Sequence, residues 1–153
     1  IEREVDFMLK LYLDNCCYSR PFDDLRQEKN NLEAQAIKVI IDKYCKDEFQ
    51  IYTSDALVLE MNNIKDQIKR AKVLEVYNKL NLTNIKFSEK IKQRAIELRQ
   101  YNIKDMDSLH LAFAESKDVD YFITTDRLLI NASKRENLKI KVINPINFIM
   151  EVI

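Results

Sequence analysis

The chain has 153 residues, of which 46% are apolar and 33% are charged, a composition typical of one soluble globular domain with a sizeable core. Lysine and arginine together number 25, as do aspartate and glutamate, so the net charge gives no support for a nucleic-acid partner, and attraction to phosphate would need a local patch or bound cations. The absence of glycine excludes the phosphate loop, the dinucleotide-binding turn and the nucleophile elbow, each of which depends on glycine's backbone freedom.

Leader, membrane and cysteine patterns indicate a cytoplasmic protein without a membrane partner. Residues 1–10 carry several charges and therefore do not read as a signal peptide, and no apolar run approaches the roughly 18 residues of a membrane span. Cys16, Cys17 and Cys45 give neither a paired disulfide framework nor a zinc-binding CxxC motif, as expected in a reducing cytoplasm. Met8 is a candidate start of the natural chain, which would make residues 1–7 an extension.

The first predicted element is a buried strand, Leu9–Leu13, which forms a nearly continuous apolar run and ends at Asp14. A polar segment over residues 15–31 follows. It is longer than a usual connection and is therefore predicted to be a functional loop. Apolar residues then recur at helical spacing over Leu32–Cys45 and as a second strand over Phe49–Thr53.

Helices and strands are predicted to alternate along the rest of the chain. Ser54, Ser88 and Asn144 are in positions typical of helix caps, and Pro145 suits the first position of a terminal helix. The further predicted helices are Asp55–Asn62, Asp66–Leu80, Ser88–Gln100, Asp105–Ser116 and Arg127–Arg135, and the further strands are Asn84–Phe87, Tyr121–Thr124 and Lys139–Ile143.

The alternation predicts an α/β fold with parallel strands, right-handed crossovers and three α/β/α layers. No internal repeat, low-complexity segment or linker interrupts it, so residues 1–153 are interpreted as one domain. With no glycine available, asparagine is expected to take the left-handed turn and helix-end positions, at Asn62, Asn63, Asn81, Asn102 and Asn137.

Two predicted strands run into an acid, Asp14 after the first and Asp126 after Tyr121–Thr124. Ligands of open parallel sheets bind at the carboxyl ends of the strands, and neighbouring strands lie about 4.8 Å apart, so these two acids could share a cation. A divalent ion would relieve their repulsion, and oxygen ligands suit Mg²⁺ or Mn²⁺. Asp107, at a helix start, and Glu60, within an apolar stretch, are the other candidate ligands.

Each of these acids also has an ordinary structural interpretation. Helix caps, first-turn acids and solvated carboxylates are common in proteins without any ligand. The alternatives are a turn at Asp14, a helix cap at Asp126, first-turn positions for Asp105 and Asp107 with Asp105 as the better cap, and a solvated surface for Glu60.

The remaining candidates are weaker. His110 lies three residues after Asp107 and shares its helix face, but no serine elbow accompanies it, so the sequence favours a place outside the site. Cys16 and Cys17 follow an acid that should raise their thiol pKa, which favours a packing role. Arg20 is a candidate for contact with a phosphate backbone.

Four segments together resemble the PIN-domain nucleases over about residues 8–150. The most specific are the helix start at Asp107 with its alanine spacing and the strand end Phe-Ile-Thr-Thr before Asp126. The matching segments are Leu-Tyr-Leu-Asp14-Asn15, Ser-Asp-Ala-Leu-Val-Leu-Glu60, Asp107-Ser-Leu-His-Leu-Ala-Phe-Ala114 and Phe122-Ile-Thr124-Thr-Asp126.

The resemblance implies a PIN-like sheet of five parallel strands in the order 3-2-1-4-5, with the four acids gathered at one end. Thr124 and Asn15 would support them, Thr124 by orienting a carboxylate or a water. The implied activity is an endoribonuclease that uses one or two Mg²⁺ or Mn²⁺ ions to hydrolyse RNA, leaving a 5′-phosphate and a 3′-hydroxyl. Many relatives are VapC-type toxins that pair with an antitoxin protein and form homodimers.

Three other interpretations stay open. The first is an inactive RNA- or protein-binding module on the same fold. A haloacid-dehalogenase-type phosphotransferase would need a second aspartate where Cys16 stands. A receiver-like phosphoacceptor domain would usually have an acidic pair at the first strand, where Asn15 follows Asp14 instead.

Overall fold

A computed structural model describes residues 8–153; the expected extension over residues 1–7 lies outside the described part. Five parallel strands form one sheet in the order β3-β2-β1-β4-β5. The strands are β1 (Leu9–Leu13), β2 (Phe49–Ser54), β3 (Thr83–Ile85), β4 (Tyr121–Ile123) and β5 (Lys141–Ile143). The α/β class and the strand order 3-2-1-4-5 are thereby confirmed.

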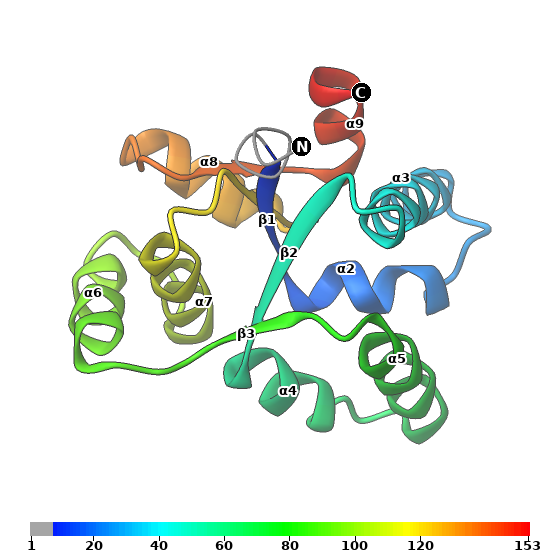
Figure 1. The fold of residues 1–153 in the computed structure, drawn as a ribbon, viewed down its shortest axis with the longest axis horizontal. Coiled ribbons are helices and arrows are strands. Elements are labelled where there is room, and N and C mark those ends of the chain that lie inside the picture. Colours follow the sequence, from blue (N-terminus) through cyan, green and yellow to red (C-terminus); the bar gives the residue numbers. More distant parts are fainter. Residues whose placement is uncertain (1–7) are drawn as a thin grey trace.

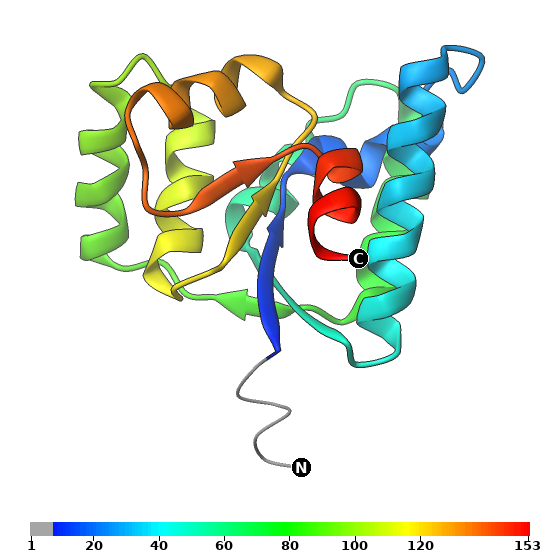
Figure 2. The same ribbon diagram turned by 90° about the horizontal axis from the view of Figure 1, so that it is seen from above.

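Helices cover both faces of this sheet. In Figure 2, α6 and α7 lie on one side of the strands, and α3 with α9 lies on the other. Figure 1 shows the same helices at opposite sides of the sheet. The helices are α2 (Asn15–Ser19), the 3-10 helix η1 (Arg20–Phe22), α3 (Glu28–Cys45), α4 (Asp55–Asn62), α5 (Gln67–Leu80), α6 (Glu89–Arg99), α7 (Asp105–Ser116), α8 (Arg127–Arg135) and α9 (Pro145–Val152).

The second half of the central strand β1 is fully buried, because both faces of the sheet are covered by helices and both edges of this strand are paired. Leu11, Tyr12 and Leu13 have no exposed surface. This is why β1 reads as a nearly continuous apolar run, interrupted by Lys10, rather than as an alternating one. The ring of Tyr12 stacks on Phe122 of β4, with centroids 5.3 Å apart and 11° between the planes.

The register aligns the carboxyl ends of β1, β4 and β5. Leu13 is opposite Ile123, and the Asp14 amide donates to the Ile123 carbonyl at 2.9 Å. The Thr124 amide donates to the Ile143 carbonyl, also at 2.9 Å. Residues that directly follow these strands therefore meet at one edge of the sheet.

The segment over residues 15–31 differs from its prediction as a loop. It contains α2, η1 and the first turn of α3, with only a short connection between them. The Asp14 carboxylate accepts from the Asn15 amide and starts α2, and Pro21 stands in the first turn of η1. Helices this short carry too little periodicity to be distinguished from a polar loop in the sequence.

The predicted cap at Asp105 is wrong, and the predicted cap at Ser54 is right in position only. Ser54 is the N-cap residue of α4, but its hydroxyl makes no cap bond and lies 2.7 Å from the Tyr12 hydroxyl instead. Asp105 lies inside the first turn of α7, after Lys104. Ser88 does cap α6, and Asn144 caps α9 with Pro145 in its first turn, as predicted.

Left-handed backbone occurs at five described positions, all of them Asn or Asp. Three predicted asparagines are among them, whereas Asn62 lies in α4 and Asn63 has a φ of −94°. Asp47 and Asp118 were missed because aspartate was not considered for this role. The five residues are Asp47, Asn81, Asn102, Asp118 and Asn137, with φ between 50° and 60°.

Candidate metal centre

A pocket of about 420 Å³ opens at the carboxyl ends of β1 and β4. All four predicted acids line it: Asp14, Glu60, Asp107 and Asp126. They come from four separate places in the chain, namely the end of β1, α4, the start of α7 and the turn after β4. The structure thus brings these side chains together, whereas their role as metal ligands stays a prediction.

Asp14 is the most deeply placed of the four, with 6% of its surface exposed. Its Oδ1 accepts from the Asn15 amide at 2.8 Å and its Oδ2 accepts from the Thr124 hydroxyl at 2.8 Å. Burial raises the pKa of this carboxyl well above its usual range, and nearby Cys16 and Asp107 raise it further. His110 and the Thr124 hydroxyl act in the opposite direction but do not cancel the effect.

The Thr124 hydroxyl ties two acidic positions together. It donates to the Asp14 carboxylate and accepts from the Asp126 amide at 3.1 Å. Thr124 is fully buried, so this bridge is shielded from water. A hydroxyl two residues before the last acid therefore fixes the relative placement of Asp14 and the turn that carries Asp126.

Asp107 and Asp126 both line the pocket, and each stands at the start of a helix. Burial raises the pKa of Asp107, and the charge of Asp126 is the next largest cause. Asp126 also caps α8, because its Oδ1 accepts from the amides of Leu128 and Leu129 at 3.0 and 3.3 Å. Asp126 therefore caps α8, as its ordinary structural interpretation predicted, and also lines the pocket.

Glu60 comes from α4 and meets His110 of α7. Its Oε1 hydrogen-bonds to His110 Nε2, and the imidazole has no exposed surface. The sequence favoured a place outside the site for His110, which the structure contradicts. The sequence did show the helix face that His110 shares with Asp107, three residues earlier, but gave no sign of the contact with Glu60.

The donor set fits a hard divalent cation. Asp14, Glu60 and His110 each offer an atom, and the three atoms lie within 4.8 Å of one another. The Asn15 amide oxygen is buried and has no hydrogen-bond partner among residues 8–153, although Asn15 lines the pocket. Carboxylate and amide oxygens are the ligands that Mg²⁺ and Mn²⁺ take, so the residues present match the predicted ions.

Sequence reasoning missed two charged residues that also line the pocket. Lys69 of α5 places its ammonium on the Asp23 carboxylate, and both residues are partly buried. Their positions are 46 residues apart and belong to no motif, so nothing in the sequence indicated the pair. Five carboxylates and one ammonium line the pocket, which gives it a strongly negative lining.

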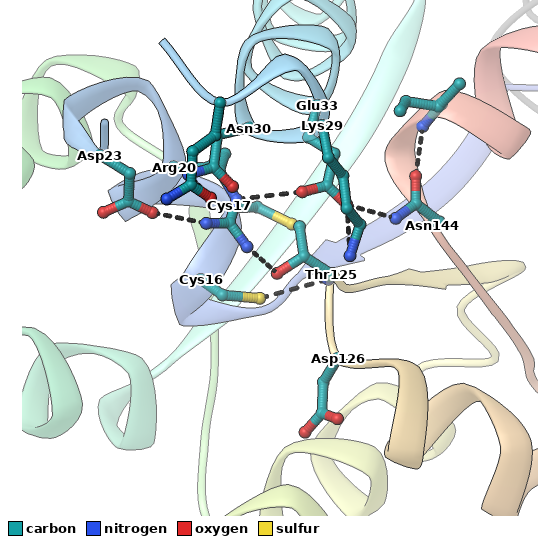
Figure 3. Close-up of polar contacts among 12 residues, drawn as sticks. Cys16, Cys17, Arg20, Asp23, Lys29, Asn30, Glu33, Thr125, Asp126 and Asn144 are labelled. Carbon is teal, nitrogen blue, oxygen red and sulfur yellow. Dashed lines mark hydrogen bonds and ion pairs between the residues drawn. The ribbon is translucent and has the colours of Figure 1, made fainter. Parts of the chain in front are cut away.

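Arg20 lies behind the pocket among protein partners (Figure 3). Its Nη1 donates to Asp23 at 2.7 Å and its Nη2 donates to the Thr125 hydroxyl at 3.1 Å. Its Nε is 3.1 Å from Glu33 Oε1, an ion pair without hydrogen-bond geometry. The carboxylate of Asp126 points away from this cluster in Figure 3. Contact between Arg20 and phosphate stays a prediction, and these partners would have to share or release the guanidinium.

The two adjacent cysteines have different surroundings. Cys17 is fully buried, and burial raises the pKa of its thiol. Cys16 lines the pocket, and hydrogen bonds from Cys17, Thr124 and Thr125 lower the pKa of its thiol to about 6. The predicted rise in thiol pKa is therefore wrong for Cys16, because these neighbouring donors outweigh the effect of burial.

Comparisons with known proteins bear on the fold alone. No family model and no curated protein matches the chain. The chain is similar to the crystal structure of VapBC2 from Rickettsia felis bound to a DNA fragment from their promoter, with a TM-score of 0.55 and 18% identity over 89% of this chain and 98% of that one. None of the helices in the described part has the length and apolar character needed to cross a membrane. The likeness, together with the strand order, makes the fold PIN-like.

Proposed function

We propose that the chain is a metal-dependent nuclease that hydrolyses phosphodiester bonds of RNA. The observation that carries the proposal is the meeting of Asp14, Glu60, Asp107 and Asp126 over one pocket at the carboxyl ends of parallel strands. RNA is the substrate that the resemblance to PIN-domain nucleases implies. The PIN-like fold and the oxygen-rich donor set support the same reaction class.

Each acid has a distinct proposed role. Asp14 and Asp126 are the principal ligands of Mg²⁺ or Mn²⁺, Asp107 completes the first shell or binds through water, and Glu60 orients the attacking water or helps to hold a second ion. A bound divalent cation would supply charge neutralisation at the phosphate and a lower pKa for that water. Thr124 and Asn15 support the set, Thr124 by holding the Asp14 carboxylate through its hydroxyl.

Phosphate would otherwise be repelled from this pocket, because carboxylates dominate its lining and Lys69 is already paired with Asp23. Binding of RNA therefore depends on the cation. Arg20 is the proposed further phosphate contact, although protein partners hold its guanidinium.

The test uses a labelled single-stranded RNA and a DNA of the same sequence, each with Mn²⁺, with Mg²⁺ or with EDTA. Asp14→Asn keeps the side-chain volume and is expected to lower cleavage by at least about 100-fold, an effect of about 2.7 kcal/mol. Asp105→Asn is the matched control, because Asp105 is an exposed first-turn acid outside the pocket. Undiminished cleavage by folded Asp14→Asn would rule out the assignment, and cleavage of DNA alone would rule out RNA.

An antitoxin partner and a homodimer belong to the same proposal. The similar structure is a VapBC2 assembly, which supports a paired antitoxin for this chain. Exposed apolar side chains on the helices, such as Ile68, Leu128 and Met150, support a protein partner or a second copy. Growth arrest on expression of the chain in a bacterial host, absent with Asp14→Asn, would support the toxin. Light scattering of the purified chain tests the dimer.

A further inference from the structure

We propose that His110 is a positioning residue that holds the Glu60 carboxylate in the pocket, and that Tyr12 and Ser54 hold the imidazole from behind. The inference rests on the proposed function in taking Glu60 as a working acid of the site. It adds three buried side chains, an imidazole and two hydroxyls, to the four acids of the proposed site.

The four side chains form one continuous series of hydrogen bonds. The Ser54 hydroxyl lies 2.7 Å from the Tyr12 hydroxyl, and the Tyr12 hydroxyl lies 2.7 Å from His110 Nδ1. On the other side of the ring, His110 Nε2 hydrogen-bonds to Glu60 Oε1. The four side chains come from the end of β2, from β1, from α7 and from α4.

Burial makes this series of hydrogen bonds rigid. Ser54, Tyr12 and His110 have no exposed surface, so water does not compete for their hydrogen bonds. The Tyr12 ring is fixed by stacking on Phe122, and its backbone is paired with β2 and β4. By contrast, Glu60 is only partly buried and is borne by α4, which makes its rotamer the adjustable part.

Donor chemistry sets the direction of the bonds. An ionised Glu60 carboxylate can only accept, so Nε2 carries the hydrogen of the His110–Glu60 bond. The other ring nitrogen faces the Tyr12 hydroxyl. Because both ring nitrogens are hydrogen-bonded, the imidazole has no free lone pair for a metal ion. It instead orients Glu60, as a residue outside the coordination shell orients a metal ligand.

Direct ligation by His110 is the competing arrangement, because its ring is close enough to Asp14 and Glu60 to share an ion with them. The two arrangements differ in a measurable way. A ligating imidazole would couple the ¹⁴N nucleus directly to bound Mn²⁺ and would favour transition metals over Mg²⁺. A positioning imidazole would give no direct coupling.

The first experiment needs no activity. The protein has one histidine, so a ¹⁵N-labelled sample gives one imidazole spin system. We expect a slowly exchanging Nε2–H resonance in metal-free protein that shifts in Glu60→Gln and is unchanged in the control Glu75→Gln, an exposed helical acid on α5. An Nε2 without a hydrogen, or a resonance that ignores Glu60→Gln, overturns the proposal.

The second experiment measures Mn²⁺ affinity by calorimetry. We expect His110→Leu to weaken binding by about 10- to 100-fold, as lost outer partners of metal ligands typically do. His110→Gln can donate from its amide to Glu60 and should recover most of the loss, and Tyr12→Phe should give an intermediate value. Ser108→Ala is the control, because Ser108 is a buried α7 residue that bonds Ile103 instead.

The outcomes separate this inference from the proposed function. Mn²⁺ binding that depends on His110, without RNA cleavage by the wild type, would support the positioning role and overturn the nuclease. Affinity unchanged in folded His110→Leu, or a direct ¹⁴N coupling to Mn²⁺, would overturn the positioning role and leave the nuclease intact. If the wild type binds no Mn²⁺, the nuclease proposal fails and the imidazole spectrum decides the bond to Glu60.

Discussion

At the scale of single residues, the Asp14 carboxylate has two structural roles. Its carboxylate starts α2 by accepting from the Asn15 amide, and it accepts from Thr124 beside the pocket. Burial and neighbouring acids oppose its ionisation, which is why its pKa is raised. A carboxylate in such a place is destabilising without a cation, and a cation would reverse that effect.

The first prediction concerns pH in metal-free protein. Asp14 and Asp107 have raised pKa values in the folded state, so as pH rises from about 4 the unfolded chain releases protons that the folded chain still holds. Their contribution to the free energy of unfolding therefore falls as pH rises, by at most about 1.4 kcal/mol per pH unit for each site. Asp14→Asn removes its share and flattens the slope.

Urea unfolding of EDTA-treated protein at increasing pH measures the effect. Asp105→Asn serves as the control and is expected to keep the wild-type slope, because Asp105 lies in the exposed first turn of α7. Identical slopes for Asp14→Asn and the wild type would contradict the prediction.

The second prediction concerns Glu33, a fully buried carboxylate of α3. It accepts from Asn144 Nδ2 at 2.6 Å and lies 3.1 Å from Arg20 Nε. Glu33→Gln leaves the guanidinium without its buried counter-charge and is expected to lower the free energy of unfolding by about 3 kcal/mol. Chemical denaturation measures it, with Glu28→Gln in the exposed first turn of α3 as the control. A loss as small as that of the control would mean that Asp23 and Thr125 suffice for Arg20.

Residue-scale prediction from the sequence worked where an acid directly follows a strand or starts a helix. Asp14 and Asp126 follow that rule, and Asp107 and Glu60 were added by the resemblance and by their unusual surroundings. The rule cannot find Glu33 or Lys69, because their partners are set by helix packing across long sequence separations. His110 was missed because a lone histidine on an apolar face gives no sign of which acid it will meet.

At the scale of elements, period and caps predicted the long helices and the strands. The ends shifted by a few residues, as with α3, which begins at Glu28 instead of Leu32. The short α2 and η1 were missed because they depend on contacts with α3 and α5 rather than on an amphipathic repeat of their own. The strand order came from the resemblance, since periodicity alone does not say which strands are neighbours.

The third prediction concerns α9, whose Phe148 side chain packs against the sheet. The ring has no exposed surface and meets Phe49 and Tyr121 edge-on, with centroids 5.7 and 5.0 Å away. Phe148→Ala is expected to lower the free energy of unfolding by about 3 to 5 kcal/mol, because a cavity replaces an aromatic core residue. Met150→Ala on the same helix is the control, since Met150 is 81% exposed. Equal effects of the two changes on the unfolding midpoint would show that α9 is not anchored by the ring.

At the scale of the whole molecule, the parallel topology does most of the work of building the site. Every crossover returns the chain to the same edge, so the carboxyl ends of the strands collect there. The sequence predicted this class because strands and helices alternate without interruption. It could not predict the depth of the pocket or the network behind it, because both arise from how α4 and α7 pack against each other and against the strand ends.

The fourth prediction is stabilisation by cation. An ion that binds only the folded chain raises the free energy of unfolding by about 2.7 kcal/mol at a hundredfold excess over its dissociation constant. Addition of Mn²⁺ is therefore expected to raise the melting temperature of the wild type and of Asp105→Asn, but not of Asp14→Asn. Differential scanning fluorimetry measures it, and an equal rise in all three proteins would place the ion elsewhere.

The left-handed residues have a consequence for engineering of heat tolerance. Asp47, Asn81, Asp118 and Asn137 end helices that lead into β2, β3, β4 and β5, so they lie where strands begin, at the edge opposite the pocket. Non-glycine residues in this conformation are strained, and glycine relieves that strain at the expense of a more flexible unfolded chain. The molecule therefore offers four helix ends, remote from the pocket, where substitution by glycine can change the thermal stability while the four acids stay unchanged.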